Sequence, residues 1–244
     1  MTSTSPISSS NSEPAEHGSL AARLHAVRSG IADAAARAER DPAEITLIAV
    51  TKCQPLSMIT QLVELGVRDF GESRHQEAQD KAAQLHAEPL TWHFVGQIQG
   101  KKARQIRAYA QVLHSIDRDS LVRALSVSSE SGEPPQRDCF IQLNLTDDPA
   151  RGGVQPSGLS QLVDEVLQSP GLRLLGLMAV APQDGDARRA FAGVRELSER
   201  MRDRAPDATS LSIGMSQDYA DAILEGATHL RIGTAITGIR PAHG

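Results

Sequence analysis

The chain has 244 residues, of which 40% are hydrophobic and 3% aromatic, and its formal net charge is -5. A chain of this length buries roughly 70% or more of the surface that it exposes when unfolded, so it needs neither a disulfide nor a metal for stability. The acidic charge and the few aromatic side chains leave little to attract or stack nucleic acid, which is therefore not an expected partner.

Cysteine usage and the absence of targeting signals favour a cytoplasmic protein. Cys53 and Cys139 are too few for a disulfide framework and form no metal-binding spacing. The first 18 residues are rich in Ser, Thr and Pro and lack the apolar run of a signal peptide, and no later run is long enough to span a membrane. We expect a disordered tail at 1–18, a single domain at 19–244, and neither a membrane nor a metal ion as partner.

An amphipathic helix and eight short apolar runs follow the tail. The helix is predicted from the spacing of Leu20, Leu24, Val27 and Ile31. The runs that predict buried parallel strands are 45–50, 67–71, 92–96, 112–116, 139–144, 174–180, 210–214 and 229–233. Segments with helical spacing lie between them. Eight such units predict the α/β architecture of a (β/α)8 TIM-like barrel, with an open doubly wound sheet as the alternative.

Lys52 directly follows the first predicted strand, ahead of a helix that Pro55 is expected to start. Active sites of such barrels are built from the C-terminal ends of the strands and the loops that follow them. Lys52 is therefore a candidate site residue, although an ordinary solvated loop lysine is the alternative.

The loops after the last two strands predict a phosphate-binding cup. One strand ends in Gly214, Met215 and Ser216, another in Gly233 and Thr234, and a helix is expected to start at once after each. Glycines allow close backbone approach, and the free N–H groups of a helix start favour anions. The alternative is a pair of helix caps without any ligand.

A lysine and a phosphate cup at one barrel mouth suit a ligand that carries both a phosphate and a carbonyl group. A lysine amine is mostly protonated at neutral pH, so its attack on a carbonyl requires desolvation or a neighbouring cation. Arg231 has the same strand parity as Gly233, which predicts that it points inward one layer lower. A core arginine bonded to groups of neighbouring strands is the alternative.

Six motifs together resemble the YggS/PROSC family of pyridoxal 5'-phosphate (PLP) homeostasis proteins. They are AVTK at 49–52, FGES at 70–73, WHFVGQIQGKK at 92–102, IQLNLTDDPARGG at 141–153, GLMAVAP at 176–182, and the segment from LSIGMS to TGIR at 211–240. The resemblance runs from Ile45 to Arg240.

The resemblance implies a fold-type-III PLP barrel like the N-terminal domain of alanine racemase, with Lys52 holding PLP as a Schiff base. It also implies phosphate contacts at Ser216, Gly233 and Thr234, beside Met215, with Arg231 close to the pyridine nitrogen. One position departs from the family: Ser73 stands where an asparagine is usual, and the shorter hydroxyl replaces an amide beside the cofactor.

These features lead us to expect a non-catalytic PLP-binding protein of intracellular vitamin B6 homeostasis. Its expected partners are PLP and related vitamers, with apo-enzymes as possible recipients, and we expect a monomer with an open mouth. A PLP-dependent racemase is the alternative, but racemization needs a second base, and Tyr109 and Tyr219 fall within predicted helices. A cofactor-free Schiff-base aldolase is a third hypothesis. His93 is expected to be a hydrogen-bonded core histidine and not a base.

Overall fold

The computed structural model describes residues 18–127, 135–146, 148 and 151–238. The predicted tail therefore lies outside the described residues, apart from Gly18. Eight parallel strands close into a barrel in chain order, with β8 paired to β1. The strands are β1 (Thr46–Val50), β2 (Asp69–Glu72), β3 (Thr91–Phe94), β4 (Val112–Ile116), β5 (Arg137–Gln142), β6 (Leu172–Met178), β7 (Ser210–Ser212) and β8 (His229–Ile232). The barrel prediction is confirmed. The alternative of an open sheet is wrong, because an open sheet has two unpaired edge strands and here β1 and β8 pair with each other.

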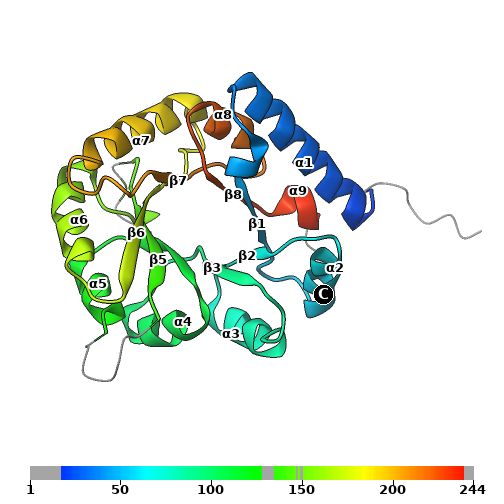
Figure 1. Cartoon of the computed structure of the whole chain (residues 1–244), viewed down its shortest axis with the longest axis horizontal. Coiled ribbons are helices and arrows are strands. Elements are labelled where there is room, and N and C mark those ends of the chain that lie inside the picture. Colours follow the sequence, from blue (N-terminus) through cyan, green and yellow to red (C-terminus); the bar gives the residue numbers. More distant parts are fainter. Residues whose placement is uncertain (1–17, 128–134, 147, 149–150, 239–244) are drawn as a thin grey trace, which may run out of the picture.

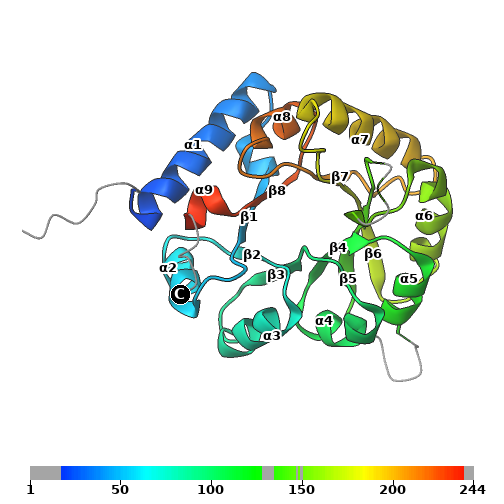
Figure 2. The ribbon, with the colours of Figure 1, turned by 180° about the vertical axis from the view of Figure 1, so that it is seen from behind.

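Helices surround the barrel as a ring (Figures 1 and 2). They are α1 (Leu20–Arg37), α2 (Leu56–Glu64), α3 (His75–Gln84), α4 (Ala103–Tyr109), α5 (Asp119–Leu125), α6 (Leu159–Leu167), α7 (Ala187–Met201), α8 (Tyr219–Leu224) and α9 (Thr234–Thr237), with short 3-10 turns at Pro42–Glu44, Gly100–Lys102 and Pro156–Gly158. The predicted helix α1 is capped by Ser19, whose Oγ accepts from the N–H of Ala22, and it packs beside α8 and α9 (Figure 1). No helix in the described ranges is long and apolar enough to cross a bilayer.

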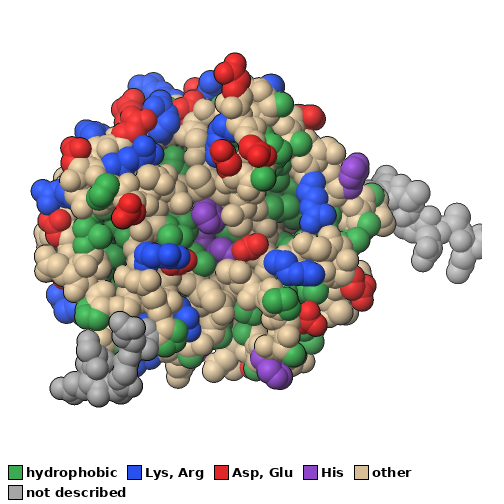
Figure 3. Space-filling model, viewed as in Figure 1, with side chains coloured by type: hydrophobic (Ala, Val, Ile, Leu, Met, Phe, Trp, Pro, Cys, Tyr) green, Lys and Arg blue, Asp and Glu red, His purple; other side chains and the backbone are tan. Residues whose placement is uncertain are grey.

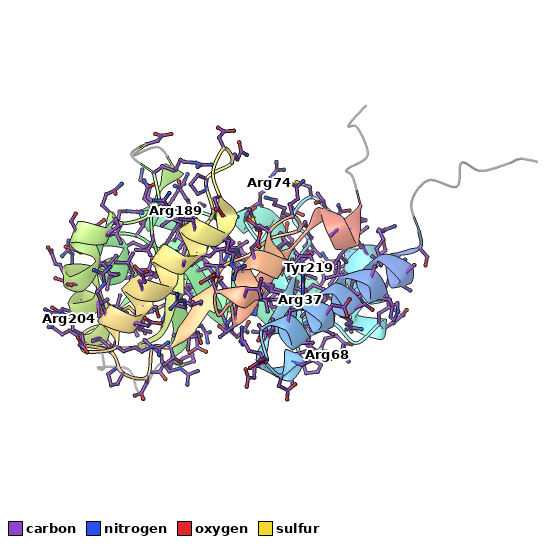
Figure 4. The ribbon with its side chains drawn as sticks, turned by 90° about the horizontal axis from the view of Figure 1, so that it is seen from above. Arg37, Arg68, Arg74, Arg189, Arg204 and Tyr219 are labelled. Carbon is purple, nitrogen blue, oxygen red and sulfur yellow. The ribbon has the colours of Figure 1, made fainter. Side chains whose placement is uncertain are left out.

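The two ends of the barrel are distinguished by the direction of the strands. Arg68 precedes β2 and Arg74 follows it, and Figure 4 shows them at opposite edges of the molecule. We call the end with the C-terminal ends of the strands the mouth and the opposite end the floor. Figure 2 views the barrel from the mouth, and Figures 1 and 3 view it from the floor.

The apolar core lies mainly between the strands and the ring of helices. It includes Phe70, Phe94 and Phe191, which are fully buried. A separate small cluster of Val112, Phe140 and Met178 is not continuous with this core. Barrels of this kind usually fill their interior with branched aliphatic layers. In this chain several interior positions are polar instead, and they determine how the site at the mouth is built.

Candidate functional site

A cavity of about 870 Å³ opens among the loops at the mouth. All seven residues that the sequence predicts for the site line it: Lys52, Ser73, Met215, Ser216, Arg231, Gly233 and Thr234. They come from loops after four strands, β1, β2, β7 and β8, and from β8 itself. The apolar part of the cavity wall is formed by Val50, Val95, Met178, Val180, Ala181 and Pro182. The cavity thus combines apolar surface with a few polar groups, as is typical of small-molecule sites.

Lys52 lies in a tight turn after β1 and is exposed to solvent. The N–H of Gln54 donates to the carbonyl of Thr51 at 3.0 Å, and Cys53 has a φ of 61°, a backbone conformation that is uncommon for a residue with a side chain. We invoked desolvation or a neighbouring cation to make the amine reactive. Lys52 is exposed, so burial does not desolvate its amine, and the cation that lines the same cavity is Arg231.

A buried ionic cluster holds the turn that carries Lys52. Lys81 Nζ donates to the carbonyl of Thr51 and to Glu72 Oε1, both at 2.8 Å, and to Glu77 Oε1 at 2.5 Å. Thr51 Oγ1 also donates to Glu72 Oε1 at 2.8 Å. The N–H of Cys53 donates to Glu77 Oε1 at 2.6 Å. Both neighbours of Lys52 in the sequence are therefore fixed, and we call Glu72, Glu77 and Lys81 the ionic cluster.

Burial makes this arrangement costly unless its charges stay paired. Glu72 is 1% exposed, and burial raises the pKa of its carboxyl, while the hydrogen bond and the charge of Lys81 act against that rise. Glu72 Oε2 has no hydrogen-bond partner in the part of the chain that the structure describes. Lys81, at 5% exposure, is the cation that compensates both carboxylates.

The loop after β7 differs in one respect from its prediction. Gly214 has a φ of 93°, and a Cβ there would lie 2.6 Å from the Cβ of Ala222, so this strand end requires glycine. However, α8 does not begin at once. A turn intervenes, the N–H of Met215 donates to Asp218 Oδ1 at 2.6 Å, and the helix starts at Tyr219. The prediction that a helix with free N–H groups starts at once after this strand end is therefore wrong, because a turn capped by the Asp218 side chain precedes α8.

Ser216 and Thr234 join the two loops across the cavity wall. Their hydroxyl oxygens lie 3.4 Å apart, and Ser216 Oγ accepts from the N–H of Ala235 at 3.3 Å. A Cβ on Gly233 would meet only Val50, at an ordinary 3.7 Å. The absent side chain thus leaves room on the cavity side, beside two hydroxyl groups. This is a cradle that an anionic group of moderate size fits.

Arg231 lines the cavity and is 5% exposed. Its Nη1 donates to the carbonyl of Ser212 and to Ser212 Oγ, at 2.5 and 2.6 Å, and its Nη2 donates to the carbonyl of Ala179 at 2.9 Å. The inward orientation is confirmed, and the bonds to neighbouring strands that we gave as the alternative are present as well. Burial lowers the pKa of the guanidinium to about 10, with the charge of Asp218 opposing the shift, so Arg231 stays protonated at neutral pH.

Ser73 is half-buried after β2, and its backbone lies so close to Gly96 that a Cβ on Gly96 would be 2.5 Å from the Ser73 carbonyl oxygen. Neither tyrosine reaches the cavity: the Tyr109 hydroxyl lies 3.3 Å from His75 Nδ1, and the Tyr219 hydroxyl faces Gly30 on α1. Among the described residues, the ionisable groups that line the cavity are Lys52, Asp218, Asp221 and Arg231.

Several residues that hold Lys52 and Arg231 in place were not predicted from the sequence. Glu72 and Lys81 looked like ordinary charged residues of a strand end and a helix, and His114 and Ser212 like polar interruptions of apolar strands. The signal for the last two was available, because a polar residue inside a short buried strand needs a partner. His93 is confirmed as a buried core histidine, and each of its ring nitrogens has a hydrogen-bond partner.

Comparisons with known proteins give the same architecture. The family described as "Alanine racemase, N-terminal domain" matches residues 22–241. A Pseudomonas aeruginosa relative named "Pyridoxal phosphate homeostasis protein" is 40% identical over 221 residues, which cover 91% of this chain and 96% of the relative. The solved structure of PipY from Synechococcus elongatus with PLP bound is 32% identical, with a TM-score of 0.78, and the match covers 90% of this chain and 100% of PipY.

A more distant solved structure is similar to this chain in fold alone. Alanine racemase from Corynebacterium glutamicum is 15% identical with a TM-score of 0.65, and the match covers 91% of this chain but 62% of the racemase. The racemase thus has a substantial part that this chain does not match.

Proposed function

The chain belongs to the YggS/PROSC family of PLP homeostasis proteins, within the wider alanine racemase N-terminal domain family, and on that premise we propose that it binds PLP reversibly at the mouth of its barrel. The observation that carries the proposal is the convergence of Lys52, Arg231 and the Ser216–Thr234 cradle on one cavity. The proposal is supported by PipY, a relative at 32% identity whose structure contains PLP.

The residues at the mouth fit the chemical groups of PLP. The hydroxyls of Ser216 and Thr234, with the room beside Gly233, suit the phosphate. Arg231 is a charged donor for an unprotonated ring nitrogen, and Val180 and Met215, which are 39% and 38% exposed, offer apolar surface to the ring. Exposed large apolar side chains at a cavity rim are typical of a surface that a ligand covers.

Lys52 is the group that we propose to hold the cofactor covalently. Its neutral amine attacks the aldehyde carbon, and loss of one water molecule leaves a carbon–nitrogen double bond that water can reverse. The exposed position of Lys52 favours such reversibility, because water reaches the linkage from the open mouth. Reversible retention is the property that a buffer or carrier of PLP requires.

The names of the relatives favour a homeostatic role over catalysis. Racemization by two bases needs an acid or base on each face of the substrate carbon, and Lys52 serves only one. Of the other ionisable side chains among the described residues along the cavity, Asp218 is engaged with the N–H of Met215, Arg231 remains protonated, and Asp221 in the first turn of α8 is the one carboxylate left. We therefore propose a protein that buffers PLP and releases it, with apo-enzymes as recipients, and not an amino-acid racemase.

The proposed binding is tested by titrating the protein with PLP and following absorbance in the visible region. Wild type is expected to develop a new band and to retain cofactor through desalting, whereas Lys52→Ala gives no such band. Ser216→Ala and Thr234→Val should each weaken retention by roughly 1.5–3 kcal/mol, the loss of one charge-assisted hydrogen bond. Equal binding and an unchanged band in Lys52→Ala would reject the proposal.

The choice between carrier and enzyme is tested separately with PLP-loaded protein. We expect no steady racemization of alanine above that of free PLP. Steady turnover that Lys52→Ala abolishes would identify an enzyme instead. A protein that binds no PLP but is trapped by borohydride with a sugar phosphate would identify a cofactor-free aldolase.

We further propose a monomer that works in the reducing cytosol. Cys53 and Cys139 are free thiols, and burial raises the pKa of the Cys139 thiol to about 12, which suits a reducing compartment. Light scattering at micromolar concentration is expected to give the mass of one chain. A stable dimer that releases cofactor only on unfolding would contradict the open-mouth carrier.

A further inference from the structure

A chain of hydrogen bonds crosses the barrel interior beneath the cavity. Arg231 Nη1 on β8 donates to Ser212 Oγ on β7 at 2.6 Å, and Ser212 Oγ lies 2.8 Å from His114 Nδ1 on β4. His114 Nε2 lies 2.9 Å from His93 Nδ1 on β3, and His93 Nε2 lies 3.0 Å from Asp69 Oδ1 on β2. Strands β7 and β4 are not neighbours, so the chain passes through the interior. We call these five residues the relay.

The relay connects the two ends of the barrel. Arg231 lines the cavity at the mouth, whereas Asp69 is the first residue of β2, at the floor, where its side chain is 30% exposed. Between them His93, His114 and Ser212 are 2%, 0% and 0% exposed. Figure 3 views the floor and shows histidine side chains at its centre beside an acidic one. The three buried residues thus lie between the cavity at the mouth and the partly exposed Asp69 at the floor.

The directions of the hydrogen bonds follow from the donors available. Arginine only donates, so Ser212 Oγ accepts from Arg231, and its own hydrogen is satisfied by donation to His114 Nδ1. A neutral His114 then carries its proton on Nε2 and donates to His93 Nδ1. His93 in turn donates from Nε2 to Asp69. Each bond points from the cation at the mouth toward the anion at the floor.

The surroundings keep His114 neutral. Burial lowers the pKa of His114 well below its usual value, and the charges of His93, Arg231 and His229 act in the same direction. The neighbouring His229, whose Nδ1 lies 2.8 Å from Thr228 Oγ1, has its pKa lowered by burial to about 4. No group of histidines, cysteines or carboxylates in the described ranges is arranged to hold a metal. Within the relay, burial thus favours a neutral His114 between the guanidinium of Arg231 and the carboxylate of Asp69.

We propose, resting on the function proposed above, that the relay positions Arg231 for the ring nitrogen of the ligand. Asp69, His93, His114 and Ser212 are then positioning residues, since none of the four touches the ligand. Donation of the Ser212 hydrogen to His114 Nδ1 fixes the hydroxyl rotor and leaves the lone pairs of Ser212 Oγ to accept from the guanidinium. A guanidinium that is already fixed by acceptors donates to the ligand without reorganisation, which favours a ligand whose ring nitrogen is an unprotonated acceptor.

The test compares PLP with 1-deaza-PLP, in which carbon replaces the ring nitrogen. Wild type is expected to bind PLP about tenfold more tightly than the deaza analogue, the value of roughly one hydrogen bond to a charged group. Ser212→Ala should reduce that preference to about twofold by weakening PLP binding alone. Ser198→Ala is the matched control, because Ser198 on α7 is also fully buried but its Oγ has no partner among the described residues.

The charged end of the relay is tested at Asp69. Asp69→Asn keeps an acceptor for His93 but removes the charge, and it should lower the preference for PLP by about two- to threefold, a fraction of one hydrogen bond. Asp138→Asn, at the same end of the barrel and paired with Arg173 outside the relay, should leave the preference unchanged. Equal losses for PLP and the deaza analogue in both relay variants would show a merely structural role and overturn the proposal.

An NMR measurement tests the relay without any ligand. Long-range ¹H–¹⁵N spectra of the ligand-free protein at pH 7 should show His93 and His114 as neutral Nε2-protonated tautomers, and Asp69→Asn should retain both. A proton on Nδ1 of His114 would reverse the chain and refute the relay. If wild type binds neither compound, the proposed function fails and the role of Arg231 toward the ligand fails with it, while the spectra still decide whether the relay exists.

Discussion

Two polar supports lie beneath the mouth, and they are built in opposite ways. The ionic cluster under Lys52 consists of two carboxylates and one ammonium group, between β2 and α3. The relay leads from Arg231 through one hydroxyl and two imidazoles to the carboxylate of Asp69. The cluster grips backbone groups on both sides of Lys52 and leaves that side chain free. The relay grips the side chain of Arg231 itself.

The difference matches what each cation has to do. A reactive amine must move and must shed its proton, so the support fixes only the turn from which it projects. A guanidinium that donates to a ligand must keep its charge and its orientation, so the support consists of acceptors aimed at the guanidinium. The turn that carries Lys52 and the orientation of Arg231 are thus both held by residues that do not line the cavity.

Removing the centre of the ionic cluster should have the largest effect. Lys81→Met leaves Glu72 and Glu77 without their shared cation, and such a loss destabilises by about 3–5 kcal/mol. Urea unfolding measures it. The double variant Glu72→Gln/Lys81→Met is the control and should recover part of the loss, because no buried charge is then left at position 72. A loss below 1 kcal/mol in Lys81→Met would show that the cluster does not hold the turn.

The second-largest effect is expected from acid, which should lower the free energy of unfolding by protonating buried histidines. The pKa of His229 is about 4 when folded, against an ordinary value of 6.5, so the unfolded chain binds more protons between these values and stability falls as pH decreases through this window. At about 1.4 kcal/mol per pKa unit, the contribution approaches roughly 3 kcal/mol. The lowered pKa of His114 has the same sign, and the raised pKa of Glu72 the opposite one.

The variant His229→Gln separates these contributions. It removes one titrating group, so its unfolding free energy should change less between pH 7 and pH 5 than that of wild type. An identical pH dependence in the two proteins would mean that His229 is not held neutral in the folded chain.

Breaking the relay should cost less stability than breaking the ionic cluster. Ser212→Ala removes one oxygen and leaves His114 Nδ1 without its partner, a loss of about 1–3 kcal/mol. Thermal unfolding of this variant beside Ser198→Ala provides the measurement. A cost as large as that of Lys81→Met would remove the distinction between a charged and a neutral support.

The smallest effect is expected at an exposed ion pair of the floor. Arg173 Nε donates to Asp138 Oδ1 at 2.6 Å, but the arginine side chain is 59% exposed. Arg173→Ala should therefore change stability by at most about 1 kcal/mol. A larger loss would show that surface charge, and not burial, decides what the polar groups of this barrel contribute.

The sequence predicts the barrel and the residues that line the cavity well. Eight apolar runs predicted eight strands, because a strand buried on both faces leaves a clear pattern. All seven candidate residues line one cavity, since strand ends of a barrel converge at its mouth. The turn before α8 was missed, because the Asp218 side chain competes there with the start of the helix.

The two supports could not be predicted as networks. His114 and Ser212 lie on strands that are far apart in the chain, and only closure of the barrel brings their side chains together. Lys81 has the spacing of a solvated helix residue, and its burial depends on how α3 packs against β2. Strand parity and the cost of burying a polar group indicate that such a residue needs a hydrogen-bond partner, but they do not show which residue the partner is.

The central claim, that PLP is held reversibly on Lys52, is tested most directly by borohydride reduction of the PLP-loaded protein followed by peptide mapping. We expect a single pyridoxyl group on the peptide that contains Lys52, and full loss of labelling when the cofactor is removed by dialysis before reduction. Labelling of another lysine, or an unchanged visible band and unchanged labelling in Lys52→Ala, would contradict the account.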